Sequence, residues 1–328
     1  IMRICRAVEG MPLAIELAAS WVRTLTPDDI AAELTRSLDI LETPSRNVPE
    51  RHRSMRAMMR HTWSLLTPAE RETFQAMSVF RAGFTREAAE SVSGASLWML
   101  QTLVDKSLLK RDIDGRYRIH ELLRQFAAEQ LERQAGAADT ALDRHAAYYL
   151  DFAARQWPLL TSARQLDTLE TMRRELENVR AAWSYAAQRQ QLDRLQPALL
   201  PLWYFHLLTY RYEDGRQMFL SADKSLRVCK YGDEAARAFY AYFISRFSSF
   251  VSRGDVEVQM LHEALDLQAT APHPPVHRAH LLLSAIHAYT SAIGLLMRYV
   301  PDWAALLQAY AEESLVLCEQ HGGIWEQA

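Results

Sequence analysis

Four histidines gather in the C-terminal half, in the stretch HPPVHRAHLLLSAIHA. Imidazole nitrogens at this density could bind a metal, and two of the residues, His277 and His280, share one face of a predicted helix. No cysteine or carboxylate joins them at ligand spacing, so histidines that face solvent or cap their neighbours are the favoured interpretation. The sequence therefore predicts no metal site. The cluster consists of His273, His277, His280 and His287.

A second candidate for chemistry is the His120-Glu121 pair, which stands where a strand pattern changes into a helix pattern. The run Tyr117–Leu131 begins with a period of two and continues after His120 with an apolar stripe of period about 3.6. Asp114-Gly115, just before it, is a strong hairpin-turn signal. The plain interpretation is a surface histidine at a helix start, with Glu121 favoured in the first turn by the helix dipole. From the residues alone, that interpretation and a functional role both stay open.

Motifs of nucleotide-cleaving and hydrolytic enzymes are absent from the sequence. It contains no GxxxxGK[ST], no GxGxxG and no HExxH, and its serines lack the context of a nucleophile elbow. A chain without a P-loop cannot bind and split a nucleotide by that route alone. We therefore expect no enzymatic activity from this chain by itself.

The composition fits a globular, multidomain protein. The 328 residues are 49% hydrophobic and 23% charged. The net charge of -3 argues against a broad electrostatic footprint for nucleic acid. Three cysteines lie far apart without a CxxC, which suits a reducing cytosol, and no apolar run approaches the roughly 20 residues of a membrane span. We expect a cytoplasmic protein with no membrane partner.

Prolines mark the helix starts of the N-terminal part. Gly10 and Pro12 interrupt a helical pattern over residues 1–22, so Pro12 takes the first position of a second helix. Thr26-Pro27 starts a third. The polar segment 43–53 is predicted as a linker. Its basic neighbourhood is interpreted as a solvated helix face in preference to a phosphate site; the residues are Arg51, His52, Arg53, Arg56 and Arg60.

The next block, residues 54–134, predicts a winged helix. Helices are expected over 55–66, from Pro68, over 86–92 and over 96–106, followed by strands over 107–113 and 116–119. The helix from Pro68 should start with a capping box formed by Thr67 and Glu70. The candidate recognition helix is the one over 96–106, and of its residues only Gln101 and Lys106 could contact base edges. We therefore expect no direct DNA readout by this chain. Four wing residues suffice for some phosphate contact: Lys110, Arg111, Arg116 and Arg118.

Everything after about residue 141 is predicted to be helical. The segments Glu213–Leu226, Gly254–Leu267 and Asp302–Leu317 echo one another at intervals of about 40 to 50 residues, longer than the roughly 34 of a tetratricopeptide repeat. Such a pattern favours stacked helical hairpins that bury their apolar faces against neighbours. The aromatic residues of the array are interpreted as core in preference to a ligand cage: Trp183, Trp203, Tyr204, Tyr240 and Tyr242. The predicted fold is thus mainly α: a small helical domain (1–48), a winged-helix domain with a two-stranded wing (49–136) and TPR-like helical repeats (137–328).

The order of these features resembles the STAND class of signal-transduction ATPases. EGMPLAIELAAS, from residue 9, resembles the GLPLA motif of that class, and RIHELLRQFA, from residue 118, resembles its MHD motif, with Ile119 for Met and Glu121 for Asp. The stretches 103–131 and 175–186 are similar to the bacterial AfsR-like and LuxR-type regulators, and the plant NB-ARC (AP-ATPase-like) proteins are more distant. The resemblance covers residues 1–190, and the repeats match only as a type.

The resemblance implies roles for two residues. In the family the GLPLA proline packs near adenine, which implies this place for Pro12. The MHD histidine contacts the β-phosphate of ADP and holds the closed state, which implies this role for His120. An imidazole that donates to a phosphate suits the position. Because Glu is a poorer short-range cap than Asp, the change at Glu121 puts the second residue's capping role in question.

The resemblance also implies a larger protein. Both ends of the chain look like interrupted helices, so we expect a fragment whose P-loop, Mg²⁺-holding acids and sheet lie upstream in the same polypeptide. ADP or ATP with Mg²⁺ would then be cofactors of that parent, with none bound tightly by this chain alone. The repeats would receive an unknown inducer or protein, and the output would be transcription.

Two other hypotheses compete with a regulatory fragment of a STAND switch. One is a free-standing scaffold whose repeats bind other proteins and whose winged helix is only structural. The other, weaker, is a winged-helix repressor that binds DNA, which predicts duplex binding by residues 54–136 with a steep salt dependence.

Overall fold

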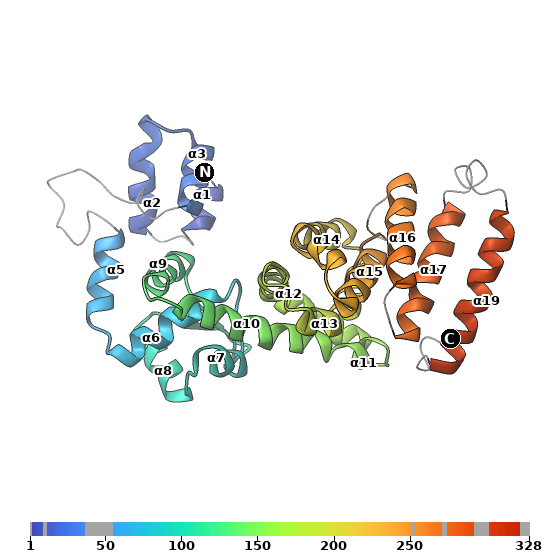
Figure 1. Ribbon diagram of the computed structural model, residues 1–328. Coiled ribbons are helices and arrows are strands. Elements are labelled where there is room, and N and C mark those ends of the chain that lie inside the picture. Colours follow the sequence, from blue (N-terminus) through green and yellow to red (C-terminus); the bar gives the residue numbers. More distant parts are fainter. Residues whose placement is uncertain are drawn as a thin grey trace. The chain divides into compact units, whose positions relative to one another are not determined.

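The computed structural model describes residues 2–8, 12–36, 55–248, 250, 254–270, 274–291 and 302–321. The predicted mainly α fold is confirmed, because helices follow one another along the described chain and a single two-stranded sheet interrupts them (Figure 1). The chain divides into two compact units, Ile1–Tyr148 and Tyr149–Ala328. The predicted domain limits at residues 48 and 136 remain predictions. The predicted linker 43–53 and the basic residues Arg51, His52 and Arg53 lie outside the described residues.

The first unit consists of short helices and one hairpin. In chain order its elements are α1 (Met2–Ala7), α2 (Pro12–Ala19), η1 (Ser20–Arg23), α3 (Pro27–Arg36), α5 (Met55–Ser64), α6 (Pro68–Ala76), η3 (Met77–Val79), α7 (Arg86–Ser93), α8 (Leu97–Asp105), β1 (Lys110–Arg111), β2 (Tyr117–Arg118), α9 (Glu121–Glu132) and the start of α10 (Ala137–Ala154).

Proline and hydroxyl residues start these helices as predicted. Pro12 and Pro27 are the first residues of α2 and α3. Before α6 the Thr67 hydroxyl accepts from the Glu70 amide at 3.3 Å, and the Glu70 carboxylate accepts from the Thr67 amide at 2.7 Å. This reciprocal pair is the predicted capping box, and it satisfies two amides that the first turn would otherwise leave unpaired.

The wing hairpin has shorter strands than predicted. Lys110 pairs with Arg118 and Arg111 with Tyr117, around a turn in which Gly115 has a φ of +83°. The prediction of a strand from Ser107 was wrong because Ser107 adopts a φ of 57° at the end of α8. The amides that follow it bond back to the helix carbonyl of Leu103 instead of to a neighbouring strand.

One hydrophobic core joins the first helices to the helix after the wing. Its buried members come from α1, α2, α3, α5 and α9. They include Ala14 and Leu17 of α2, and Leu122 and Phe126 of α9, all less than 5% exposed. The Trp63 ring of α5 packs edge-on against Phe126 at 5.7 Å between centroids. The helix that Pro12 begins and the helix that His120 precedes are therefore parts of one packed structure.

The second unit is an array of longer helices. Its elements are the end of α10, α11 (Trp157–Leu160), α12 (Gln165–Gln188), α13 (Leu192–Leu208), α14 (Tyr212–Leu226), η4 (Arg227–Tyr231), α15 (Glu234–Ser248), α16 (Gly254–Ala269), α17 (Pro275–Ser291) and α19 (Trp303–His321). The three echoing segments of the sequence correspond to α14, α16 and α19.

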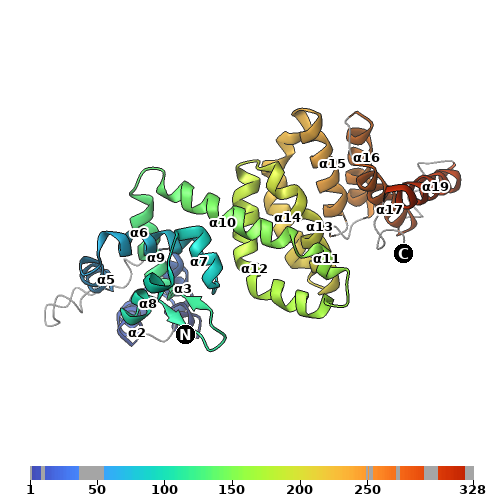
Figure 2. The ribbon, with the colours of Figure 1, turned by 90° about the horizontal axis from the view of Figure 1, so that it is seen from below.

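Packing in this array is repetitive. Alternate helices α13, α15 and α17 contact one another in turn, and α16 packs against both α15 and α17. In Figure 1, α16, α17 and α19 run side by side, and Figure 2 shows the same helices from below. The structure therefore confirms a repeat-like helical array.

Aromatic side chains form much of the interior of the array. Trp183, Tyr240 and Tyr242 are at most 2% exposed, as predicted for core residues. Trp203 and Tyr204 are only half-buried and stack at 6.2 Å between ring centroids. None of the helices in the described part of the chain is long and apolar enough to cross a membrane.

Gly215 lies where α14 packs closely against neighbouring side chains, so its replacement by alanine has two opposing effects on stability. A Cβ at this position of α14 would lie 3.0 Å from the His206 Cβ and 2.9 Å from the buried Phe250 ring. Gly215→Ala gains about 1 kcal/mol of helix propensity, whereas overpacking costs roughly 1–3 kcal/mol. We expect a net loss of stability in urea unfolding, with Lys224→Ala on the exposed face as a neutral control. Equal or higher stability of Gly215→Ala would contradict this packing.

Candidate functional site

His120 occupies the joint between the wing and α9. It is the N-cap residue of α9, and its Nδ1 accepts the amide proton of Leu122 at 3.2 Å. An acceptor nitrogen carries no proton, so the neutral ring bears its proton on Nε2. The predicted strand-to-helix change at His120 is therefore confirmed, and the imidazole itself caps the helix.

The second ring nitrogen of His120 has no such partner. Nε2 is buried, and no atom of the described residues makes a hydrogen bond to it. A buried donor without an acceptor costs roughly 1–3 kcal/mol. Such groups are rare enough in folded proteins that each calls for an explanation, such as a ligand, a water or an ion.

Basic side chains surround the cavity that His120 lines. This cavity of about 600 Å³ lies between the end of α8 and the wing. Lys110, Arg111 and Arg118 line it, and Asp112 is its one acid. The Asp112 carboxylate forms an ion pair with the Arg118 guanidinium at 2.5 Å. The excess of positive charge favours an anionic occupant. The sequence had placed these bases on the wing without linking them to His120.

The wing that carries these residues is anchored by Phe84. The amide and carbonyl of Phe84 pair with those of Tyr117, both at 2.9 Å. The Phe84 ring is fully buried and stacks on Phe80 at 4.1 Å and near Tyr117 at 6.2 Å between centroids. The backbone position of the wing, and with it that of His120, therefore depends on Phe84.

The Glu121 side chain pairs with Arg124 and does not cap α9. Its carboxylate accepts two hydrogen bonds from the Arg124 guanidinium, at 2.7 and 2.8 Å, and one from Gln125 at 3.0 Å. Arg124 also donates to the carbonyl of Ser78 at 3.1 Å. Although burial acts to raise it, these hydrogen bonds and the Arg124 charge hold the pKa of Glu121 below its usual range. The pair ties the first turn of α9 to η3, and only the Glu–Arg spacing of three residues could have indicated it.

The structure places Pro12 at the start of α2, but the Pro12 side chain is outside its description, as are Gly10 and Met11. What it does describe is the shared core of α2 and α9. The two predicted contact residues thus stand at the starts of two helices that pack into one core.

Two histidines of the C-terminal cluster, His277 and His280, pack against other side chains of the helical array. His277 stacks on Tyr242 at 3.8 Å between ring centroids. Burial, followed by the nearby charges of Arg246 and His277, lowers the pKa of His280 to about 3, so this imidazole is neutral at physiological pH. The described residues contain no group of three or more potential metal ligands; His273 and the side chain of His287 lie outside them.

Gln101 and Lys106, the two candidate base-reading residues of α8 and its C-cap, both make contacts within the protein. The Gln101 amide donates to Asp105 at 2.8 Å. Lys106 donates to both carboxylate oxygens of Glu70, at 2.7 and 2.8 Å. Trp98, by contrast, is 82% exposed on this helix. These contacts leave few free donors for base edges on α8.

The Lys106–Glu70 pair should make stability depend on pH. The hydrogen bond from Lys106, followed by the Thr67 amide, holds the pKa of Glu70 below 4.5. Since the folded pKa is depressed, the stabilisation is present above about pH 4.5 and is lost as pH falls through the folded pKa. We expect Glu70→Gln to cost roughly 1–2 kcal/mol at pH 7 and almost nothing at the acid limit of folding. A cost that does not change with pH would contradict the ion pair; urea unfolding at several pH values measures it.

The chain is similar in sequence to parts of bacterial regulatory proteins. A Mycobacterium tuberculosis protein named as an HTH-type transcriptional regulator is 34% identical over 219 residues, which cover 61% of this chain and 24% of that protein. The regulatory protein AfsR of Streptomyces coelicolor is 33% identical over 161 residues, 44% of this chain and 16% of AfsR. The predicted resemblance to AfsR-type bacterial regulators is confirmed. The chain spans about a quarter or less of the length of these two relatives.

No family model matches the chain. A solved structure of a STAND protein with a tetratricopeptide repeat sensor, from Pyrococcus horikoshii, aligns with 95% of this chain and 54% of its own at 14% identity. Its TM-score of 0.28 is too low to establish a common fold.

Proposed function

We propose that this chain is the regulatory part of a STAND-type switch that controls transcription. The proposal depends mainly on one observation: His120 holds a buried donor, without a partner among the described residues, beside a basic cavity. The donor and the surrounding positive charge fit a phosphate oxygen. The STAND resemblance of the sequence supplies the identity of that anion, the β-phosphate of ADP.

His120 would act through both ring nitrogens. Nδ1 fixes the orientation of the imidazole by capping α9, so the Nε2 proton points in one fixed direction. ADP would supply the oxygen that accepts this proton. Lys110 and Arg111, which make no ion pair within the described residues, would add attraction for the negative charge. Nothing in this arrangement cleaves a phosphate, so we expect no ATP hydrolysis by this chain alone.

The shared core gives the contact a mechanical consequence. Because α2 and α9 contribute to one hydrophobic core, a nucleotide held near Pro12 and His120 would stabilise their joint arrangement. Replacement of ADP by ATP, together with an inducer or a protein on the helical array, would favour an open arrangement. These ligands would shift the equilibrium because they bind the open state with higher affinity than the closed state. The P-loop, the Mg²⁺ ligands and the output domain would belong to other parts of the parent.

The repetitive packing of α13, α15 and α17 supports a second candidate, a scaffold that binds proteins without any nucleotide switch. The coding sequence upstream of Ile1 separates the two. The switch predicts, within about 250 codons, a strand followed by GxxxxGK[ST] and a later apolar strand that ends in acids. An unrelated domain or a stop codon there would refute the switch and leave the scaffold.

A further inference from the structure

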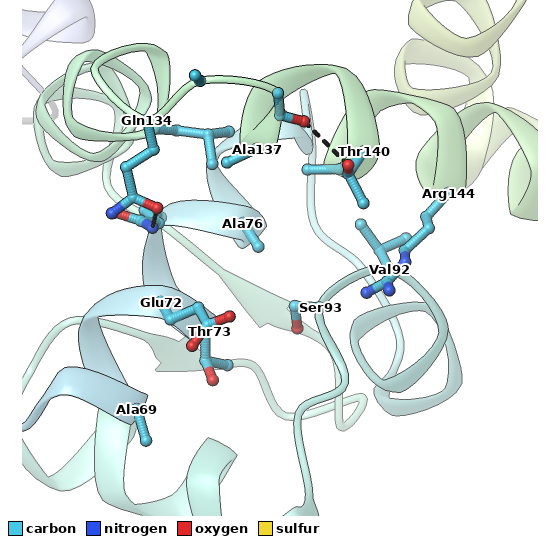
Figure 3. A pocket seen from close by; sticks show the side chains of 15 residues that line it. Ala69, Glu72, Thr73, Ala76, Val92, Ser93, Gln134, Ala137, Thr140 and Arg144 are labelled. Atoms are coloured by element: carbon cyan, nitrogen blue, oxygen red, sulfur yellow. Dashed lines mark hydrogen bonds between the residues drawn. The ribbon is translucent and has the colours of Figure 1, made fainter.

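A second cavity in the first unit lies away from the wing. It has a volume of about 640 Å³, opens to solvent on one side, and is bordered by α6, the end of α7, the turn between α9 and α10, and the first turns of α10 (Figure 3). None of its lining residues belongs to the His120 cavity. Whatever it binds is therefore independent of the nucleotide proposal.

Small side chains and one amide pair keep this cavity open. The helices face it with four alanines, Ala69, Ala76, Ala137 and Ala141, and with Gly136 in the turn. At its edge the Gln75 amide of α6 donates to the Gln134 side-chain oxygen at 2.8 Å, and Gln75 is 2% exposed. This bond holds the end of α9 against α6, so the space is part of the fold and is not a loosely packed surface.

Opposite charges face the cavity from different helices. Glu72 projects from α6 and Arg144 from α10, and Figure 3 shows them on opposite sides of the space. Within the described residues neither makes a hydrogen bond or an ion pair, with the other or with any third group. Two opposite charges that line one cavity without pairing can each bind a complementary group.

Two hydroxyl groups of the lining can accept hydrogen bonds from an occupant. Ser93 donates its proton to the Ala89 carbonyl at 2.7 Å, and Thr140 donates to the Gly136 carbonyl at 2.9 Å. Their oxygens can therefore only accept from an occupant, as the Glu72 carboxylate does. An ammonium group, with three donors and no acceptor, suits the Glu72 carboxylate, whereas Arg144 offers a fork of donors to an acid group.

We propose that this cavity binds a small zwitterion, with its ammonium group at Glu72 and its carboxylate at Arg144. A purely anionic ligand would meet the Glu72 charge, and a purely cationic one would meet Arg144. The alanines and Val92 leave room for a short apolar body between the charged ends. An occupant of this kind would bridge α6 and α10 and so brace the first turns of α10, the helix in which the first unit ends.

A series of ω-amino acids tests the proposal on the whole 328-residue chain. Calorimetric titration would use 4-aminobutanoate to 8-aminooctanoate, with hexanoate and hexylamine as probes that carry one charge each. We expect at least one chain length to bind roughly tenfold more tightly than either singly charged probe, since each lost end removes a charge-assisted contact. Absence of binding by every member of the series, or equal binding of hexanoate or hexylamine, would overturn the proposal.

Charge reversal makes the test specific for this cavity. Glu72→Arg and Arg144→Glu should each weaken the best probe roughly tenfold or more, because one end then meets a like charge. The double reversal should restore binding, because a probe with simple ends can turn around. Glu90→Arg, on the exposed side of α7, is the matched control and should bind like the unmodified chain. Glu72, Glu90 and Arg144 are all exposed, so the variants should keep the fold. A double variant that binds no better than the singles would contradict the assignment.

Discussion

Replacing Phe84 by alanine is expected to destabilise the first unit by about 3–5 kcal/mol. The ring is fully buried between Phe80 and Tyr117, and the Phe84 backbone forms two hydrogen bonds with Tyr117 of the wing. Loss of the ring leaves a cavity beneath β2, so the wing and His120 should lose their fixed position as well. Urea unfolding measures the stability, and the NMR signals of the His120 imidazole report its mobility.

A nearby exposed residue provides the control for Phe84. Ile113 at the wing turn is fully exposed, so Ile113→Ala should change stability by less than about 0.5 kcal/mol. If Phe84→Ala cost as little as Ile113→Ala, or if it destabilised the chain while leaving the His120 signals unchanged, the anchoring role of Phe84 would be wrong.

In the full-length parent, replacing His120 by asparagine should weaken ADP retention roughly 10- to 100-fold and raise basal transcriptional output. Asparagine is a good N-cap, so α9 keeps its start, while the Nε2 donor is lost. A hydrogen bond to a charged group contributes about 1.5–3 kcal/mol, which corresponds to this range. The ADP that copurifies with the protein, and a reporter gene under its control, give the two measurements.

Two companion variants separate the roles of the imidazole. His120→Ala removes both the cap and the donor, so it should lose ADP like His120→Asn and in addition lose about 1 kcal/mol of stability. His262→Ala, an exposed histidine of α16, should behave like the unmodified parent. Normal ADP occupancy in His120→Asn would count against a nucleotide contact at this residue.

Local signals in the sequence predicted much of the fold. The capping box at Thr67, the proline starts at Pro12 and Pro27, and the Asp114-Gly115 turn depend on neighbours in the chain, and all appear as expected. The extent of the wing strands was wrong, because whether the amides after Ser107 pair with a strand or with the end of α8 is decided by the left-handed backbone at that residue. A serine gives no sign of that conformation, as a glycine would have done.

Features that need distant segments could not be predicted. The sequence singled out His120 and the wing bases separately, but their meeting in one cavity depends on how α8 ends and on the pairing of Phe84 with Tyr117. Likewise Glu72 and Arg144 lie far apart in the chain and line one cavity because α6 and α10 both border it. Periodicity identifies which side of a helix is buried, yet it does not say which helix will cover it.

The most direct test of the proposed switch compares two nucleotides on two proteins. The dissociation constants of ADP and AMP would be measured for the parent and for its His120→Asn variant. If His120 donates to the β-phosphate, the substitution weakens ADP roughly tenfold or more and leaves AMP, which lacks that phosphate, unchanged. An equal loss for both nucleotides, or no loss for ADP, would show that His120 does not sense the phosphate.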